Sequence, residues 1–283
     1  MPSDGNSQVM SGRLYGSHFI FLVSSRCVSI VTPLSSAVKA AAEYDVVWEK
    51  FLPSDYQDIL SRLASPLVFK SKKELFLRLS NPILVDKGKK MLWLDKSTSK
   101  KCYMLSAREL SITWANDPLY WCWKPFPQSR FDQVVELVTT WWLEINGMIH
   151  TRMLSPNTTY KAYLIVKFAD RAYGLDSLPS DLSVEVRNHK SNGTIYLRYP
   201  EDKKQLLERL WMLNRIETLR PSGVATGEER VPCERDDGWM EIELGEFFCG
   251  ESNEEVKMSL KEVKSVHLKG GLIVEGIELR PKK

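Results

Sequence analysis

The residue types best suited to binding chemistry are concentrated in one stretch, because five of the nine tryptophans lie between residues 114 and 142. The segment ARELSITWANDPLYWCW places Trp114 and Trp121 on either side of an Asn-Asp-Pro turn, next to Asn116 and Asp117. A sugar is bound by this mixture, since its C–H face packs on an aromatic ring while its hydroxyls form directed hydrogen bonds with amide and carboxylate groups. The stretch therefore predicts a carbohydrate-binding surface that needs no metal.

Strand alternation gives the same rings a competing role. In LSITW, Leu110, Ile112 and Trp114 fall on one face of a strand, and that face is expected to point into the core. Trp121 follows the turn directly and is expected to lie near a loop rim. Alternation thus predicts that Trp114 is mainly buried and that Trp121 is the more accessible ring.

No catalytic signature accompanies the tryptophans. The sequence lacks the H-E-x-x-H zinc motif, the G-x-x-x-x-G-K phosphate loop, the G-x-S-x-G nucleophile elbow and the dinucleotide fingerprint. The four histidines are scattered without the spacing of metal ligands or of a catalytic base: His18, His150, His189 and His267. The sequence therefore predicts a binding protein and not an enzyme, with no catalytic residues, no metal site and no cofactor.

Composition narrows the classes of partner. With 39 basic and 36 acidic residues the formal net charge is only +3, which argues against nucleic acid as a partner. The five cysteines are widely spaced without a C-x-x-C pair, which favours a reducing compartment over a disulfide framework. The apolar run HFIFLV is too short for a membrane span and Arg26 follows it closely, so we expect neither a membrane segment nor a signal peptide.

The residue patterns divide the chain into four regions. Residues 1–33 mix Ser, Gly and short apolar pieces and predict no defined fold. Residues 34–80 carry helical patterns, and residues 81–100 connect them to the last region. Residues 101–283 carry the short alternating runs of a β domain.

Breakers and caps predict three short helices in the second region. A helix rich in alanine begins near Ser35 or Ser36 and is broken by Pro53. The next begins at Ser54, and the third at Ser71, each with a Gln or Glu at capping-box spacing. We expect a small helical unit at this end of the chain.

Beyond residue 83, β-branched and aromatic residues alternate with polar ones in short runs separated by turns. Many short strands without long helices between them predict a mainly β fold, an antiparallel β-sandwich. The KGG at Lys269–Gly271 joins two such runs as a hairpin turn would. The segment Glu201–Leu213 is the exception, because its apolar spacing fits either a helix or a polar connection before a strand.

Several motifs occur together in an order typical of one family: ARELSITWANDPLYWCW, WWLEINGMI, LSPNTTYKAYLIVKF, YGLDSLPSDLSVEV and RDDGWMEIELGEFF. From Cys102 to Leu279 the sequence resembles the plant phloem protein 2, or Nictaba-like, lectins. The resemblance implies a jelly-roll β-sandwich that binds N-acetylglucosamine oligomers or N-glycan cores in the cytoplasm and nucleus, without metal. It also implies that Trp114 and Trp121 are the two sugar-binding tryptophans.

The helical segment LSSAVKAAAEYDVVWEKFLPSDYQDIL resembles the C-terminal part of the F-box module found in one branch of that family. This resemblance implies two kinds of partner, glycoproteins and the linker protein of a cullin-based ubiquitin ligase. The preceding SGRLYGSHFIFLVSSRCVSIVTP departs from the Leu-Pro-Glu-like start of an F-box, which leaves the docking surface incomplete. Three hypotheses remain: a lectin, a ligase receptor for glycoproteins, and an interaction scaffold without sugar binding.

Overall fold

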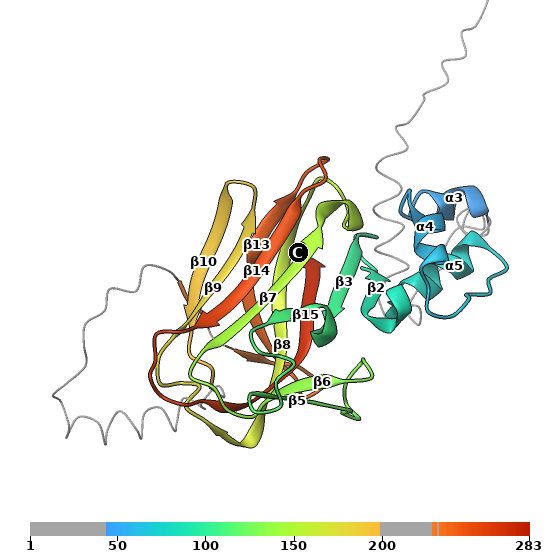
Figure 1. Ribbon diagram of the computed structural model, residues 1–283. Coiled ribbons are helices and arrows are strands. Elements are labelled where there is room, and N and C mark those ends of the chain that lie inside the picture. Colours follow the sequence, from blue (N-terminus) through green and yellow to red (C-terminus); the bar gives the residue numbers. More distant parts are fainter. Residues whose placement is uncertain (1–43, 199–227, 231) are drawn as a thin grey trace, which may run out of the picture.

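Two β-sheets packed face to face make up most of the described chain. A computed structural model of the protein describes residues 44–198, 228–230 and 232–283 (Figure 1). Within these residues, a nine-stranded and a six-stranded sheet enclose one main apolar core. The mainly β, antiparallel sandwich expected from the sequence is confirmed.

The larger sheet begins earlier in the chain than predicted. Its main path follows the order β1 (Ile83–Val85), β2 (Lys90–Leu94), β3 (Lys101–Ser106), β15 (Gly270–Pro281), β8 (Thr158–Tyr173), β13 (Met240–Cys249) and β12 (Cys233–Glu234). Two further strands attach through β15, namely β6 (Val134–Leu137) and, beyond it, β5 (Trp121–Lys124). Residues 81–100, predicted to be a connecting segment, therefore supply two strands of this sheet.

The smaller sheet has the order β11 (Glu228–Arg230), β10 (His189–Ile195), β9 (Ser180–Val186), β14 (Glu255–Glu262), β7 (Leu143–His150) and β4 (Ser111–Ile112). All its pairings are antiparallel except that of β10 with β11. Alternation places Val256, Met258 and Leu260 of β14 in the core, with Lys257 and Lys261 on the outer face. The chain crosses between the sheets from β7 to β8, β8 to β9, β13 to β14 and β14 to β15, which is jelly-roll connectivity.

The hairpin turn predicted at Lys269–Gly271 is wrong. β14 and β15 belong to different sheets, so the chain between them crosses from one layer to the other. Lys269 pairs with Thr140 instead, through backbone hydrogen bonds of 2.8 and 2.9 Å. Glycine is required at this crossing for a different reason, since a Cβ on Gly270 would lie 2.5 Å from the carbonyl oxygen of Val138. The two glycines allow the start of β15 to approach Val138 and the end of β8 closely.

Three short helices precede the sandwich and are called the helical module: α3 (Asp45–Glu49), α4 (Tyr56–Ser61) and α5 (Lys72–Leu79). The predicted cap of α5 is confirmed, because Ser71 Oγ accepts a hydrogen bond from the Glu74 amide at 3.2 Å. The cap predicted for α4 at Ser54 is wrong, since Asp55 takes that position. Predictions for residues 1–43 and for Glu201–Leu213 lie outside the described residues.

The helical module shares the core of the sandwich. Trp48, Leu75 and Leu79 are buried in the same apolar cluster as Leu92 of β2 and Tyr103 of β3. Figure 1 shows the three helices next to β2. The module therefore covers the inner face of the larger sheet near its β1–β3 edge.

Main-chain and charged contacts join the module to the sheet. The Ala64 amide donates to the Leu84 carbonyl at 2.9 Å, and the Asp86 amide donates to the Arg62 carbonyl at 3.0 Å. The side chains of Arg62 and Asp86 form an ion pair at 2.9 Å, and Lys101 pairs with Asp55 at 2.8 Å. Helices and sheet thus form one packed unit.

Candidate functional site

Trp114 leaves the strand pattern that would have buried it. β4 consists only of Ser111 and Ile112, and Trp114 has a left-handed backbone with a φ of 60°. The turn carries its ring outward, where 39% of the residue is exposed. The prediction that Trp114 points into the core is therefore wrong, because the strand ends before alternation can apply to it. A tryptophan held at positive φ stores about 1–3 kcal/mol of strain, a feature common at binding sites.

Trp121 has the opposite environment from the one predicted. Only 2% of it is exposed, and its Nε1 donates to the Thr113 carbonyl at 3.0 Å. Trp121 opens β5, and its ring packs in the main core beneath the chain that carries Trp114. The prediction of an accessible ring at a loop rim is wrong, because Trp121 belongs to strand β5 and its side chain points into the core. There the indole supports the loop that carries Trp114.

The exposed rings come together from two loops. Trp114 stacks on Tyr120 with ring centroids 4.7 Å apart, and lies 5.9 Å from Trp141 at an angle of 59°. Trp141 is 47% exposed and meets Trp142 edge to face at 6.1 Å. These four residues form the aromatic cluster, in which Trp114 and Trp141 present open ring surface at an angle to one another.

Asn116 and Asp117 lie in the same loop as Trp114. Asn116 is exposed. Asp117 is half-buried and builds the turn, since its Oδ1 accepts from the Leu119 amide at 2.9 Å and its carbonyl accepts from the amides of Tyr120 and Trp121 at 3.0 Å. Their assignment as sugar ligands stays a prediction.

Glu144 on β7 connects the two loops, and neither it nor Trp141 is among the predicted site residues. Its carboxylate accepts from Trp142 Nε1 at 3.0 Å and pairs with Lys261 Nζ at 2.8 Å. The hydrogen bond from Lys261, with that from Trp142, lowers the pKa of Glu144 to about 2. The motif WWLE, which carries both missed residues, was the available signal in the sequence.

The low pKa of Glu144 predicts a pH-dependent contribution to stability. Because the folded-state pKa lies below the ordinary 4.5, the contribution is present above that value and is lost as the pH falls toward about 2. Urea unfolding of the wild type and of Glu144→Gln should differ at neutral pH, and the gap should narrow below about pH 4.5. A gap that stays constant down to about pH 3 would contradict the assignment.

A buried ion pair supports the aromatic cluster from behind. Lys269 and Glu262 are both buried and paired, and Lys269 Nζ also donates to the Trp141 carbonyl at 2.8 Å. Glu262 in turn accepts from the amides of Lys264 and Ser265 at 3.0 and 2.9 Å. The chain between β14 and β15 is thereby fastened to the loop that carries Trp141.

Within the described ranges, no three His, Cys, Asp or Glu side chains gather as metal ligands. None of the helices in that part of the chain combines the length and apolar character needed to cross a membrane. The geometry supports binding chemistry: angled aromatic faces beside an ionised carboxylate.

Comparison with known proteins agrees with the sequence motifs. The sequence model of the family described as phloem protein 2 matches residues 100–281. F-box protein PP2-B15 of Arabidopsis thaliana is 48% identical over 88% of each chain, and F-box protein VBF of the same plant is 45% identical over 88% of this chain and 90% of its own.

A structural comparison matches the CBM22-1 xylan-binding domain of Paenibacillus barcinonensis Xyn10C. It is 12% identical, covers 63% of this chain and 88% of that domain, and has a TM-score of 0.29. The family match and the relatives decide the affiliation. The chain belongs to the phloem protein 2 family.

Proposed function

We propose that the protein is a lectin that binds N-acetylglucosamine oligomers or the core of N-glycans on the aromatic cluster, in the cytoplasm and nucleus. The observation that carries the proposal is the outward-facing Trp114, held at a φ of 60° beside the exposed Trp141. The hydrophobic effect favours burial of tryptophan rings. Two exposed rings at a strained loop therefore point to a surface that contacts a ligand.

The geometry suits a sugar better than a flat aromatic ligand. The two rings lie at 59°, so one can stack against the C–H face of a pyranose while the other contacts its edge. An N-acetyl methyl group can pack on the exposed Leu119 nearby in the same loop. Asn116 and Asp117 lie in the same loop and carry an amide and a carboxylate, groups that can bond hydroxyl or amide groups of a sugar.

Removing the Trp114 ring should abolish most of the affinity without unfolding the protein. Trp114→Ala should weaken binding of a chitin trimer about 30-fold, because a central aromatic contact contributes about 2 kcal/mol. Calorimetric titration of the full chain measures the change, with circular dichroism as the check on folding. Val68→Ala, which removes an exposed apolar side chain in the segment between α4 and α5, is the control and should bind normally.

Equal affinities of wild type and Trp114→Ala would contradict the assignment of this ring. Absence of binding to every chitin oligomer and N-glycan on an array would contradict lectin function altogether. The aromatic cluster would then be the apolar patch of a protein-interaction scaffold.

A second candidate function is that of a substrate receptor for a cullin-based ubiquitin ligase. The relatives named as F-box proteins match 88% of this chain, and α3–α5 precede the sandwich as the F-box resemblance implies. In this role the sandwich would select glycoproteins and the helical module would bind the linker protein.

Co-purification tests the ligase role separately from sugar binding. The full chain should recover the linker protein from plant extract, and Trp114→Ala should recover the same amount, because its ring lies on the sandwich and not on the helical module. Failure of both forms, while a relative with an intact F-box succeeds, would contradict the ligase role and leave the lectin proposal standing.

A further inference from the structure

Exposed apolar side chains continue from the aromatic cluster over the end of the sandwich. Three residues next to Trp141 belong to this surface and are called the apolar strip: Tyr173, which ends β8, and Val266 and Leu268, which lie between β14 and β15. They are 47, 86 and 55% exposed, respectively. Adjoining apolar side chains on the surface of a folded protein mark a place of contact with a partner.

Backbone pairing places Leu268 next to Trp141. Lys269 and Thr140 form an antiparallel bridge through hydrogen bonds of 2.8 and 2.9 Å, and both side chains are buried. The residues that follow and precede such a bridge are opposite one another and point away from the buried side. Trp141 and Leu268 therefore lie side by side on the outer surface, with Cβ atoms about 5 Å apart.

Tyr173 and Val266 adjoin Leu268. Tyr173 is the partner of Gly270 in the pairing of β8 with β15. A Cβ on Gly174 would lie only 2.2 Å from the carbonyl oxygen of Leu268, so the end of β8 lies directly against that residue. Val266 precedes Leu268 by two residues, which is at most about 7 Å along the chain. The strip is therefore one continuous surface.

The strip suits a neutral partner, because the charged side chains of the segment that carries it are already paired. Lys264 pairs with Asp181 at 2.8 Å, and Lys269 is buried with Glu262. A surface that binds anionic lipid presents free lysine or arginine side chains. Both lysines of this segment have carboxylate partners, which favours an apolar polypeptide over such a membrane.

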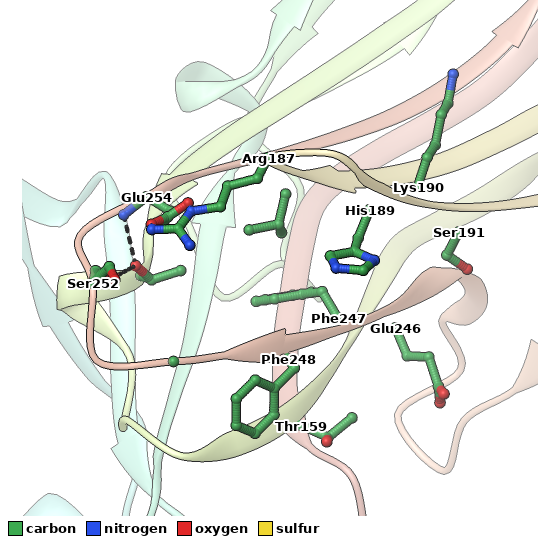
Figure 2. Close-up of a pocket in the computed structure, with 13 residues that line it drawn as sticks. Thr159, Arg187, His189, Lys190, Ser191, Glu246, Phe247, Phe248, Ser252 and Glu254 are labelled. Carbon is green, nitrogen blue, oxygen red and sulfur yellow. Dashed lines mark hydrogen bonds and ion pairs between the residues drawn. The ribbon is translucent and has the colours of Figure 1, made fainter.

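A cavity of about 710 Å³ near the turn between β9 and β10 is the other place that a partner could occupy. Figure 2 shows that its side chains do not converge on one ligand, since His189 and Phe248 lie on opposite sides of β13. Its charges are also matched, as in the pair of Glu246 with Lys282 at 2.8 Å. The members of the apolar strip, by contrast, adjoin one another and the aromatic cluster.

The proposed glycan decides which partner faces the strip. The core of an N-glycan is the part joined to an asparagine of the carrier protein, so a lectin that holds the core at Trp114 and Trp141 has the carrier polypeptide within a few sugar units. We propose that the apolar strip binds apolar residues of the polypeptide beside the glycosylated asparagine. This inference rests on the proposed lectin function. Glycan and polypeptide are then recognised together, and each contact strengthens the other because the two are covalently linked.

The test compares two short glycopeptides that differ only in the residues beside an asparagine linked to chitobiose. Leucine and valine flank it in one, and serine and glycine in the other. Calorimetric titration of the full chain should show about tenfold tighter binding of the apolar glycopeptide, because burial of a Leu or Val side chain contributes on that scale. Leu268→Ser and Val266→Ser should each remove most of this gain and still bind free chitobiose as the wild type does. Val68→Ser, which changes an exposed valine outside the strip, is the matched control and should keep the gain.

Equal affinities for the two glycopeptides, or an undiminished gain in both serine variants, would overturn the proposal. So would a dimer of the wild type in analytical ultracentrifugation that becomes a monomer in Leu268→Ser, because the strip would then join two copies of the chain. Flotation with phosphatidylcholine vesicles that Leu268→Ser abolishes would assign the strip to a lipid surface instead. Free chitobiose separates this proposal from the lectin function. Binding without any effect of the flanking residues contradicts the strip alone, whereas no binding of any probe contradicts both.

Discussion

Replacing Lys269 by methionine is expected to lower the free energy of unfolding by about 3–5 kcal/mol. The substitution keeps the apolar stem but leaves the carboxylate of Glu262 buried without its cation, and a lone buried charge is far more costly than an intact pair. The Trp141 carbonyl loses its donor in the same step. Urea unfolding measures the loss of stability. In a titration with a chitin trimer, the apparent affinity should fall in proportion to the fraction of molecules that remain folded.

A double variant distinguishes the unpaired charge from a simple packing defect. Lys269→Met combined with Glu262→Gln removes both charges while the amide oxygen still accepts from Lys264 and Ser265. It should recover a large part of the lost stability. A single Lys269→Met variant within about 1 kcal/mol of the wild type would contradict the role of the pair.

Trp121→Ala is expected to cost about 3–5 kcal/mol of stability, the range for truncating a fully buried large aromatic residue. It removes the ring from the core and also leaves the Thr113 carbonyl without the indole donor. Thermal or urea unfolding measures the loss. Since Trp121 supports the loop from below, sugar affinity should fall only through distortion of that loop.

Trp114→Ala is the matched comparison, because both substitutions remove an indole from the same loop region. Trp121→Ala should lower mainly the free energy of unfolding, whereas Trp114→Ala should lower mainly the affinity for the sugar. If Trp121→Ala were fully stable and yet lost all binding, the roles of the two tryptophans would be reversed.

Local signals in the sequence predicted the architecture well. Ser71 with Glu74 located the start of α5, and alternating runs predicted strands whose inward residues fill the core. These features depend on neighbours a few residues away, so a single sequence contains them. The short apolar runs beyond residue 83 also indicated strands, although residues 81–100 were assigned to a connecting segment and in fact supply β1 and β2.

The site could be predicted only in part, because it depends on where a strand stops. Alternation through Leu110 and Ile112 is correct, and both are buried. Nothing in the sequence shows that β4 ends at Ile112 and that Trp114 turns to positive φ. The tryptophan segment was found, but the accessibility of its two rings was inverted.

Long-range pairing explains the remaining misses. Trp141 reaches Trp114 because β4 pairs with β7, which brings two distant loops to one end of the sandwich. Lys269 looks like a turn residue in its KGG context, yet the crossing between sheets buries it behind Trp141. Such contacts follow from topology, which sequence pattern alone does not specify.

The way in which the helical module joins the sandwich has a geometrical consequence. Leu63 bridges to Val85, the chain passes from the end of α5 at Leu79 to β1 at Ile83 in a few residues, and ion pairs reinforce the junction. Among the described residues the two parts are therefore joined by several contacts as well as by the chain itself. A protein bound on the helices and a glycan bound at Trp114 would therefore keep a constant separation and orientation. Such a molecule would favour glycoproteins whose sugar lies at that fixed distance from the bound partner.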